Sequence, residues 1–256
     1  MTQSAVGIFS AAGAAGGIPT SPSLTNLRIW YDANDSSTIT VNSGRASAIT
    51  NKAAGYPWTL SQATAGKQPL IVAAAQNGKQ ILRYTNARGD ALQTKDINHP
   101  MTGATIHTWF GVYKTTETRT GYKFVIGYNS DKAFLPLQLS DKNYFENGSG
   151  LNGTTGTNNV VNVPNIQVVQ QTSGGAQFLR TYTNGTLLEN ITGTASTFFI
   201  DGTTASPPGM LTSIGTGFGD FAVPNLDFCE MLQYNIVLST NDFNNNISYL
   251  TAKWGV

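Results

Sequence analysis

The chain has 256 residues and a formal net charge of +1, and only 11% of its residues are charged. No run of lysine or arginine occurs, which excludes the basic surface expected of a nucleic-acid-binding protein. No segment approaches the ~20 apolar residues of a membrane span, so we expect no membrane insertion. Thr, Asn, Ser and 27 glycines supply the polarity, a composition that favours strands and turns over helices.

Residues 1–24 contain no charged side chain and are rich in Ala, Gly, Ser and Pro. Such a segment cannot bury enough apolar surface to fold alone. It lacks the positive residues that open a secretory leader, so we predict a retained, extended assembly arm. Its small residues would let the backbone lie against another surface, glycines would let it turn, and prolines would stiffen its exit. These residues are Gly13, Gly16, Gly17, Pro19 and Pro22.

Strand signals begin after the arm as runs of aromatic and β-branched residues, several with period-two alternation. They cover residues 27–31, 81–84, 106–113, 122–128, 165–171, 177–183 and 226–237. Asn184-Gly185 predicts a two-residue hairpin turn. The apolar side chains of the last strand are expected in phase on one face: Leu226, Phe228, Leu232, Tyr234 and Ile236. The Gly/Asn/Thr-rich stretches 146–159 and 201–210 are expected to form loops.

One helix is predicted at the C-terminal end of the sequence. Ser239 or Thr240 is a suitable N-cap, and Gly255 a suitable stop. Between them an apolar stripe recurs at spacings of four, three and four: Phe243, Ile247, Leu250 and Trp254. We expect this helix to dock on the sheet and to bury Leu250 and Trp254.

Several segments, in order, resemble motifs of the LamG-like jelly-roll domains in the concanavalin A-like lectin/glucanase superfamily. The most specific are the opening string 27–40 (LRIWYDANDSSTIT) and the closing string 249–255 (YLTAKWG). The string 230–235 (EMLQYN) between them is individually weak. Weaker matches occur at 62–69, 77–84, 110–114, 182–185 and 213–215. The resemblance covers about residues 25–256 and leaves out the arm.

The resemblance implies an all-β fold of two antiparallel sheets face to face, often with a concave surface turned to a ligand. We therefore predict a jelly-roll sandwich over residues 25–256, closed by the short C-terminal helix and preceded by the arm of residues 1–24. The family occurs in secreted bacterial proteins and in phage virion proteins, and it does not specify a ligand.

The sequence offers little for catalysis. Glucanases of this superfamily carry a Glu-x-Asp-x(1–2)-Glu cluster, and none of the four glutamates has an acid two residues later: Glu117, Glu146, Glu189 and Glu230. His99 and His107 are the only histidines and lack the spacing of a metal site, and no Gly-x-Ser-x-Gly elbow occurs. We predict no catalytic residue, no cofactor and no catalytic metal, and hence no enzyme. The single cysteine, Cys229, rules out an intrachain disulfide and is expected to be a buried thiol.

Two polar strings have both a binding and a structural interpretation. Asp32, Asn34 and Asp35 offer oxygen ligands for Ca²⁺, but short polar side chains in such a string also bond to their own backbone, and we predict the turn. The integrin-type tripeptide 88–90 (Arg-Gly-Asp) is likewise assigned to a turn.

Three aromatic residues lie in Gly/Asn-rich surroundings: Tyr56, Trp58 and Tyr144. An exposed ring stacks well on the apolar C–H face of a sugar, so these are candidate ligand-facing residues, with ordinary loop packing as the alternative.

Together these features predict a non-enzymatic phage virion structural protein. It would be a capsid decoration or head-fibre component, or a tail-fibre or baseplate component, anchored by its arm and presenting the sandwich outward. Its expected partners are other virion proteins, further copies of itself and a host surface glycan, with no nucleic acid. The main alternative is a secreted bacterial carbohydrate-binding or adhesion module; a glycan-degrading enzyme ranks third.

Overall fold

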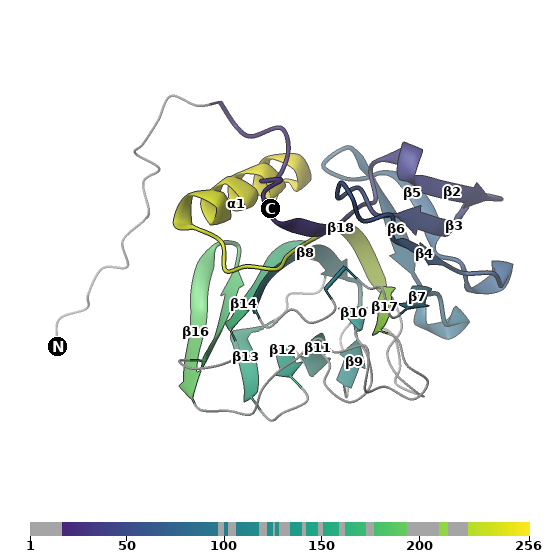
Figure 1. Ribbon diagram of the computed structural model, residues 1–256. Helices are drawn as coiled ribbons and strands as arrows, with labels where there is room; N and C mark the ends of the chain where they lie inside the picture. The colour runs from purple at the N-terminus through teal and green to yellow at the C-terminus, as the bar shows by residue number, and fades with distance from the viewer. Residues whose placement is uncertain are drawn as a thin grey trace.

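The computed structural model describes most of the chain and consists mainly of antiparallel strands with one α-helix (Figure 1). The described residues are 17–96, 100–101, 106–117, 122–124, 126–127, 134–139, 142–147, 151–158, 162–172, 177–193, 210–214 and 225–256. The predicted all-β sandwich with a short C-terminal helix is confirmed. Within these residues no helix has the length and apolar character needed to cross a bilayer.

The larger of two sheets joins fourteen strands of the described residues. They are β1 (Leu27–Asp32), β2 (Ile39–Asn42), β3 (Arg45–Thr50), β4 (Thr59–Ser61), β5 (Leu70–Gln76), β6 (Lys79–Tyr84), β7 (Leu92–Asp96), β8 (Ile106–Thr115), β10 (Ile126–Gly127), β14 (Asn165–Thr172), β15 (Gln177–Thr183), β16 (Thr186–Gly193), β17 (Met210–Ile214) and β18 (Leu226–Tyr234). Their order is β10-β17-β7-β4-β3-β5-β6-β18-β8-β14-β15-β16, with β1 paired to β18 and β2 to β3.

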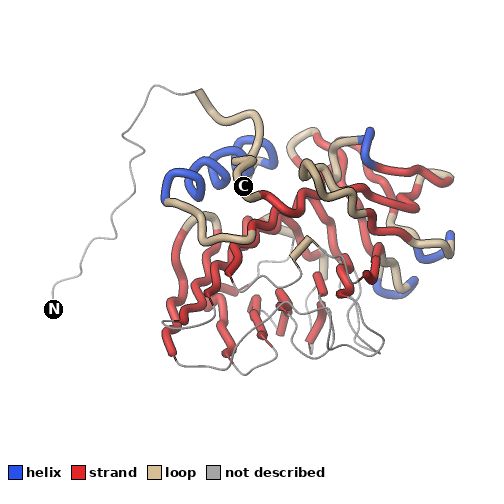
Figure 2. Tube along the Cα trace, viewed as in Figure 1, coloured by secondary structure: helices blue, strands red, loops and turns tan. Residues whose placement is uncertain are grey.

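The smaller sheet has the order β13-β12-β11-β9. Its strands are β9 (Tyr122–Phe124), β11 (Phe134–Leu139), β12 (Lys142–Asn147) and β13 (Leu151–Asn158). These strands lie on one side of β8 and β14, and the helix α1 (Thr240–Trp254) lies on the other side (Figure 2). Short 3-10 turns occur at Ser36–Thr38, Ala65–Lys67 and Asn86–Arg88.

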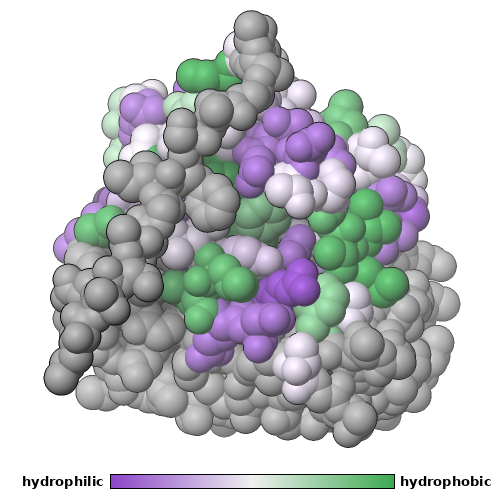
Figure 3. All heavy atoms as spheres, turned by 90° about the vertical axis from the view of Figure 1, so that its left-hand side faces the viewer, coloured by the Kyte–Doolittle hydropathy of each residue, from purple (hydrophilic) through white to green (hydrophobic). Residues whose placement is uncertain are grey.

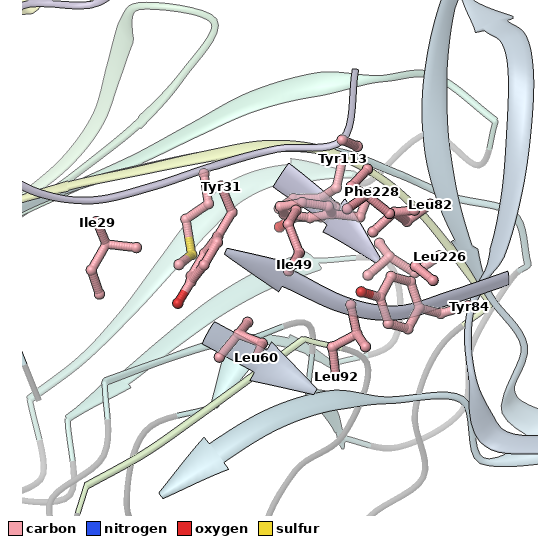
Figure 4. Close-up of a cluster of buried hydrophobic side chains, with 14 of the residues drawn as sticks. Ile29, Tyr31, Ile49, Leu60, Leu82, Tyr84, Leu92, Tyr113, Leu226 and Phe228 are labelled. Carbon is pink, nitrogen blue, oxygen red and sulfur yellow. The ribbon is translucent and has the colours of Figure 1, made fainter. Parts of the chain in front are cut away.

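The main core forms where β1, β6, β8 and β18 meet β3, β4 and β7 (Figure 4). Its buried side chains include Ile29, Tyr31, Ile49, Leu60, Leu82, Tyr84, Leu92, Tyr113, Leu226 and Phe228. Gly111 in β8 belongs to the same region, where an added Cβ would clash with the Trp109 ring. The large aromatic ring therefore needs glycine beside it.

A second buried cluster lies between the other face of the sheet and α1. Phe110, Val112, Leu232 and Tyr234 from the sheet meet Phe243, Leu250 and Trp254 from the helix. Every residue of β18 is buried, because this strand has the main core on one face and the helix on the other. Leu250 and Trp254 are 1% and 0% exposed, which confirms the predicted docking of the helix.

The helix has the predicted ends. Ser239 is the N-cap, and its side chain accepts a hydrogen bond from the backbone N–H of Asp242 at 3.2 Å. Gly255 ends the helix with a left-handed φ of +68°.

The expectation that the apolar side chains of the last strand all lie on one face is wrong. The pairing of β18 with β8 shifts between Phe228 and Glu230, as a β-bulge does. Leu226 and Phe228 therefore belong to the main core, whereas Leu232 and Tyr234 belong to the cluster under the helix. The bulge also brings Glu230 onto the helix side of the strand, which positions the site described below.

Most of the predicted strand segments are confirmed. Segments 27–31, 81–84, 106–113, 165–171 and 177–183 lie within β1, β6, β8, β14 and β15. Asn184 and Gly185 have φ of +49° and +81° and join β15 to β16, as the hairpin signal predicts. The loop expected at 146–159 is wrong, because Leu151–Asn158 forms β13. Residues 201–209 of the other expected loop lie outside the described residues.

The C-terminal part of the predicted arm packs against α1. Pro22 is buried, and Ser23 donates from its backbone N–H to Asn246 Oδ1 and from its hydroxyl to Asp242 Oδ1, each at 2.9 Å. The Tyr234 hydroxyl donates to the Ser23 carbonyl at 2.8 Å. Gly17 is exposed and Pro19 half-buried, whereas Gly13 and Gly16 lie outside the described residues. The assembly role of the arm stays a prediction.

Candidate functional site

A buried carboxylate lies where β18 faces the C-terminal end of α1. Glu230 is 0% exposed. Its Oε1 accepts from Trp30 Nε1 at 2.6 Å and from the Tyr249 hydroxyl at 2.8 Å. Its Oε2 accepts from Trp254 Nε1 at 2.7 Å and lies 2.8 Å from Lys253 Nζ. Burial raises the pKa of Glu230, because it penalises the charged form, while the Lys253 ammonium opposes this shift.

Ion pairs continue from this carboxylate toward the surface. Lys253 Nζ also lies 2.8 Å from Asp32 Oδ2, and Lys52 Nζ lies 3.0 Å from the same oxygen. Lys52 is in turn 2.7 Å from Asp35 Oδ2. The hydrogen bond from Lys52 lowers the pKa of Asp35. Charges of alternating sign thus form one ion-pair network: Asp35, Lys52, Asp32, Lys253 and Glu230.

Local backbone geometry fixes the two aspartates of the network. Asp32 Oδ1 accepts from the backbone N–H of Asn34 at 3.0 Å, and Asp35 Oδ1 accepts from that of Ser37 at 3.1 Å. These contacts confirm the predicted turn. Lysine ammonium groups lie beside both carboxylates, and the described residues contain no group of three or more His, Cys, Asp or Glu side chains that could hold a metal ion.

A surface cleft of about 430 Å³ opens above the network. Its lining comes from the end of the arm, from β1, from the β5–β6 turn and from the last turns of α1, and includes Pro19, Trp30, Lys52, Lys79, Ala252 and Lys253. Asn77 of the β5–β6 turn donates to the carbonyls of Ala252 and Lys253 at 3.3 and 3.1 Å. This contact ties the turn to the C-terminal end of the helix.

The lining combines an aromatic ring with charged hydrogen-bonding groups. Trp30 is half-buried, and Lys52 Nζ lies 4.1 Å from the centre of its ring, in cation–π geometry. Tyr249, Asn77 and Asp32 add a hydroxyl, an amide and a carboxylate. Such a surface offers donors and acceptors side by side to a polar ligand.

The same geometry works against acid–base chemistry. Asp32 and Glu230 each place an oxygen 2.8 Å from Lys253 Nζ, so these oxygens are at most about 5.6 Å apart, near the ~5–5.5 Å of retaining glycosidases. However, the Lys253 ammonium bridges them, and Glu230 has no exposed surface.

Two of the three candidate aromatic residues lie away from this cleft, and the side chain of the third is not among those that the structure describes. Trp58 is 8% exposed and belongs to the main core, so its prediction as a ligand-facing ring is wrong. Tyr56 is half-buried, with the Arg28 guanidinium 4.6 Å above its ring. Tyr144 lies in β12, and its side chain is outside the described part of the chain.

Other singled-out residues have structural roles. Cys229 is a buried thiol, as predicted, and burial raises its pKa. Asp90 of the Arg-Gly-Asp string is 0% exposed, accepts from the Thr85 backbone N–H at 2.8 Å and pairs with Arg88, which confirms the turn. Burial lowers the pKa of His107 to about 3, so its imidazole is neutral at pH 7. His99 lies outside the described residues.

Sequence reasoning did not predict that Trp30, Lys52, Glu230 and Lys253 lie together. A signal was present: Glu230 is a charged residue inside an apolar strand, and such residues are almost never fully buried unless paired. Asp32, Glu230 and Lys253 belong to the opening, middle and closing motif strings. The structure therefore shows that these three strings meet at one network.

No family model matches the sequence, and no curated protein is similar to it. Among solved structures, the fold is similar to a Trypanosoma rangeli sialidase in complex with sialic acid, with a TM-score of 0.59 and 11% identity. It is also similar to the binding domain of Paraclostridial Mosquitocidal Protein 1, with a TM-score of 0.56 and 9% identity. These alignments cover 95% and 90% of this chain, but only 35% and 53% of those chains. They establish the fold alone, a β-sandwich consistent with a concanavalin-like jelly roll.

Proposed function

We propose that this protein is a non-catalytic, lectin-like β-sandwich that binds a glycan in the cleft between β1, the β5–β6 turn and α1. The observation that carries the proposal is the half-buried Trp30 beside alternating ammonium and carboxylate groups. Sugar hydroxyls both donate and accept, and a sugar ring offers apolar C–H groups to an aromatic side chain. A sialidase and a toxin's binding domain share the fold, which supports a lectin-like sandwich.

We further propose a LamG-like domain in a phage virion, as a capsid decoration, head-fibre, tail-fibre or baseplate component. The motif strings of β1 and α1 and the uncharged segment 1–24 support this setting. The arm would bind other virion proteins, further copies of the chain would complete an oligomer, and the cleft would face a host surface glycan.

A secreted bacterial carbohydrate-binding or adhesion module is the alternative setting for the same cleft. The small residues from 12 to 17 would then border a cleavage site. Mass spectrometry of the mature protein decides between the two, since an N-terminus near residues 12–17 favours secretion and an intact arm favours the virion.

The proposal includes the absence of glycan hydrolysis. Lys253 bridges the carboxylates of Asp32 and Glu230, Lys52 bridges those of Asp32 and Asp35, and Glu230 is out of reach of a substrate. Incubation with a panel of polysaccharides should release no product. Turnover that is lost in Glu230→Gln would overturn this part.

A steric block tests the site without disturbing the network. Ala252 is an exposed helix residue that lines the cleft, and Ala252→Trp would fill it. Thr251→Trp is the matched control, because Thr251 is the preceding residue of α1, is also exposed and lies outside the cleft lining. The best ligand from a glycan array should bind at least tenfold more weakly to Ala252→Trp by calorimetry, and equally well to the control. Equal binding to both variants would contradict the proposed site.

A further inference from the structure

We infer that the cleft takes uncharged sugars through pairs of neighbouring hydroxyl groups, and that acidic sugars are not its ligands. This inference rests on the proposed glycan binding. Its basis is the charge balance of the cleft and the placement of every described arginine outside it.

The two lysines of the network, Lys52 and Lys253, are already paired with carboxylates. Lys52 contacts the carboxylates of Asp32 and Asp35 at 3.0 and 2.7 Å. Lys253 contacts those of Asp32 and Glu230, both at 2.8 Å. Two ammonium groups thus meet three carboxylates. Both ammonium groups are therefore already paired, and the five groups of the network together carry one excess negative charge. Of these groups only Asp32, Lys52 and Lys253 line the cleft.

Lys79 is the remaining charged residue of the lining, and it makes no ion pair with any described residue. Its single positive charge balances the one negative charge left over in the network. The network and Lys79 together are therefore neutral, with Asp35 and Glu230 outside the lining. One flexible ammonium in contact with water supplies little preference for an anion.

Arginine is the side chain best suited to hold a carboxylate, because its planar guanidinium donates two parallel hydrogen bonds. None lines the cleft. Arg83 and Arg88 pair with Asp227 and Asp90. The other described arginines are engaged elsewhere too: Arg45 donates to the Gln68 carbonyl at 2.9 Å, and Arg28 and Arg180 stack on Tyr56 and Phe178.

A neutral sugar suits a cleft in which hydrogen-bond donors and acceptors alternate. Asp32 is only 4% exposed but belongs to the lining, and it lies between two ammonium groups, so an acceptor and two donors are neighbours at the cleft. One hydroxyl that accepts from a lysine can donate to the carboxylate, and the hydroxyl next to it can repeat the pattern. Each such contact is charge-assisted, and none requires an unpaired charge on the ligand.

The test compares neutral and acidic probes on the same protein. The neutral probes are galacto-, manno- and gluco-oligosaccharides, and the acidic probes are oligogalacturonates and sialyllactose. We expect a neutral probe to bind, with a dissociation constant that changes less than twofold between 50 and 500 mM NaCl. Lys79→Gln should change this constant less than threefold, as should the exposed control Lys67→Gln, and Ala252→Trp should abolish binding.

The outcomes separate the two proposals. If an acidic probe binds more tightly than every neutral one, weakens at least tenfold in high salt and is blocked by Ala252→Trp, the cleft binds glycans but the inference is overturned. If a neutral probe binds and Ala252→Trp does not block it, the sugar binds elsewhere, and the cleft loses its role. If no probe of either class binds, the proposed function falls together with the inference.

Discussion

Glu230 is a buried charge held by donors from two other elements. Desolvating such a charge costs several kcal/mol, and the ion pair with Lys253 offsets much of that cost only while both partners are present. The net contribution of the pair to stability is therefore modest, but removal of one partner is expensive. We interpret the network as a device that selects one arrangement of β1, β18 and α1.

The first prediction concerns this pair. Glu230→Gln and Lys253→Met should each lower the free energy of unfolding by about 3 kcal/mol, since each leaves an uncompensated buried group. The double variant should be more stable than the sum of the two losses predicts, by about 1–3 kcal/mol. Urea denaturation of the four proteins measures this coupling. Strict additivity would mean that the two side chains do not interact.

A second prediction at this scale uses pH. Burial lowers the pKa of His107 to about 3 from an ordinary 6.5, so the unfolded chain binds the proton more readily than the folded one. The stability that neutral His107 contributes is complete above pH 6.5 and is lost as the pH falls toward 3. Between pH 7 and 4.5 the wild type should lose about 2 kcal/mol more than His107→Gln. Equal losses in both proteins would refute the buried neutral imidazole.

At the scale of elements, the docking of α1 depends on Trp254. The ring is fully buried and its Nε1 donates to Glu230. Trp254→Ala should cost about 3–5 kcal/mol through the cavity it leaves. Trp254→Phe keeps most of the packing and should cost about 1–3 kcal/mol through the lost hydrogen bond. The exposed Thr251→Ala serves as the control in urea denaturation, and a Trp254→Ala protein as stable as this control would show that the helix is not docked.

Elements with a strong local pattern could be predicted from the sequence. The stripe from Phe243 to Trp254, the capping residues and the Asn184-Gly185 turn act over a few residues and gave the right structure. The strand β13 could not be predicted, because its sequence LNGTTGTN has no apolar alternation and its pairing partner, β12, supplies its hydrogen bonds.

The site was harder to predict for a different reason. Asp32 and Lys253 are 221 positions apart in the sequence, and only the pairing of β1 with β18 and the docking of α1 bring them within 2.8 Å. A bulge of one residue near Cys229 decides which face Glu230 occupies, and no local pattern marked it. The motif strings marked the right residues without indicating that they meet.

At the scale of the whole molecule, the two ends of the described domain meet at one place. Ser23 bonds to α1, and Pro19 and Lys253 line the same cleft. The two ends of the domain thus meet at the cleft, so the stability of the domain and the shape of the proposed binding site depend on the same contacts. The arm and the proposed ligand site are neighbours.

This arrangement predicts different results for two truncations. Deletion of residues 2–16 should leave the melting temperature nearly unchanged, because the Ser23 contacts remain. Deletion of residues 2–23 removes three hydrogen bonds of Ser23, worth ~1 kcal/mol each, and should lower the melting temperature by about 5–10 °C. Both should abolish incorporation into the assembled particle if the arm is the tether. Normal incorporation of either variant would place the tether on the sandwich.

The most direct test of the account is a crystal structure of the protein with its best-binding neutral oligosaccharide. We predict sugar density in the cleft, with hydroxyl groups within hydrogen-bonding distance of Asp32 and Lys52, a ring beside Trp30, and the network unchanged. Density on another surface, with the cleft empty, would contradict the central claim.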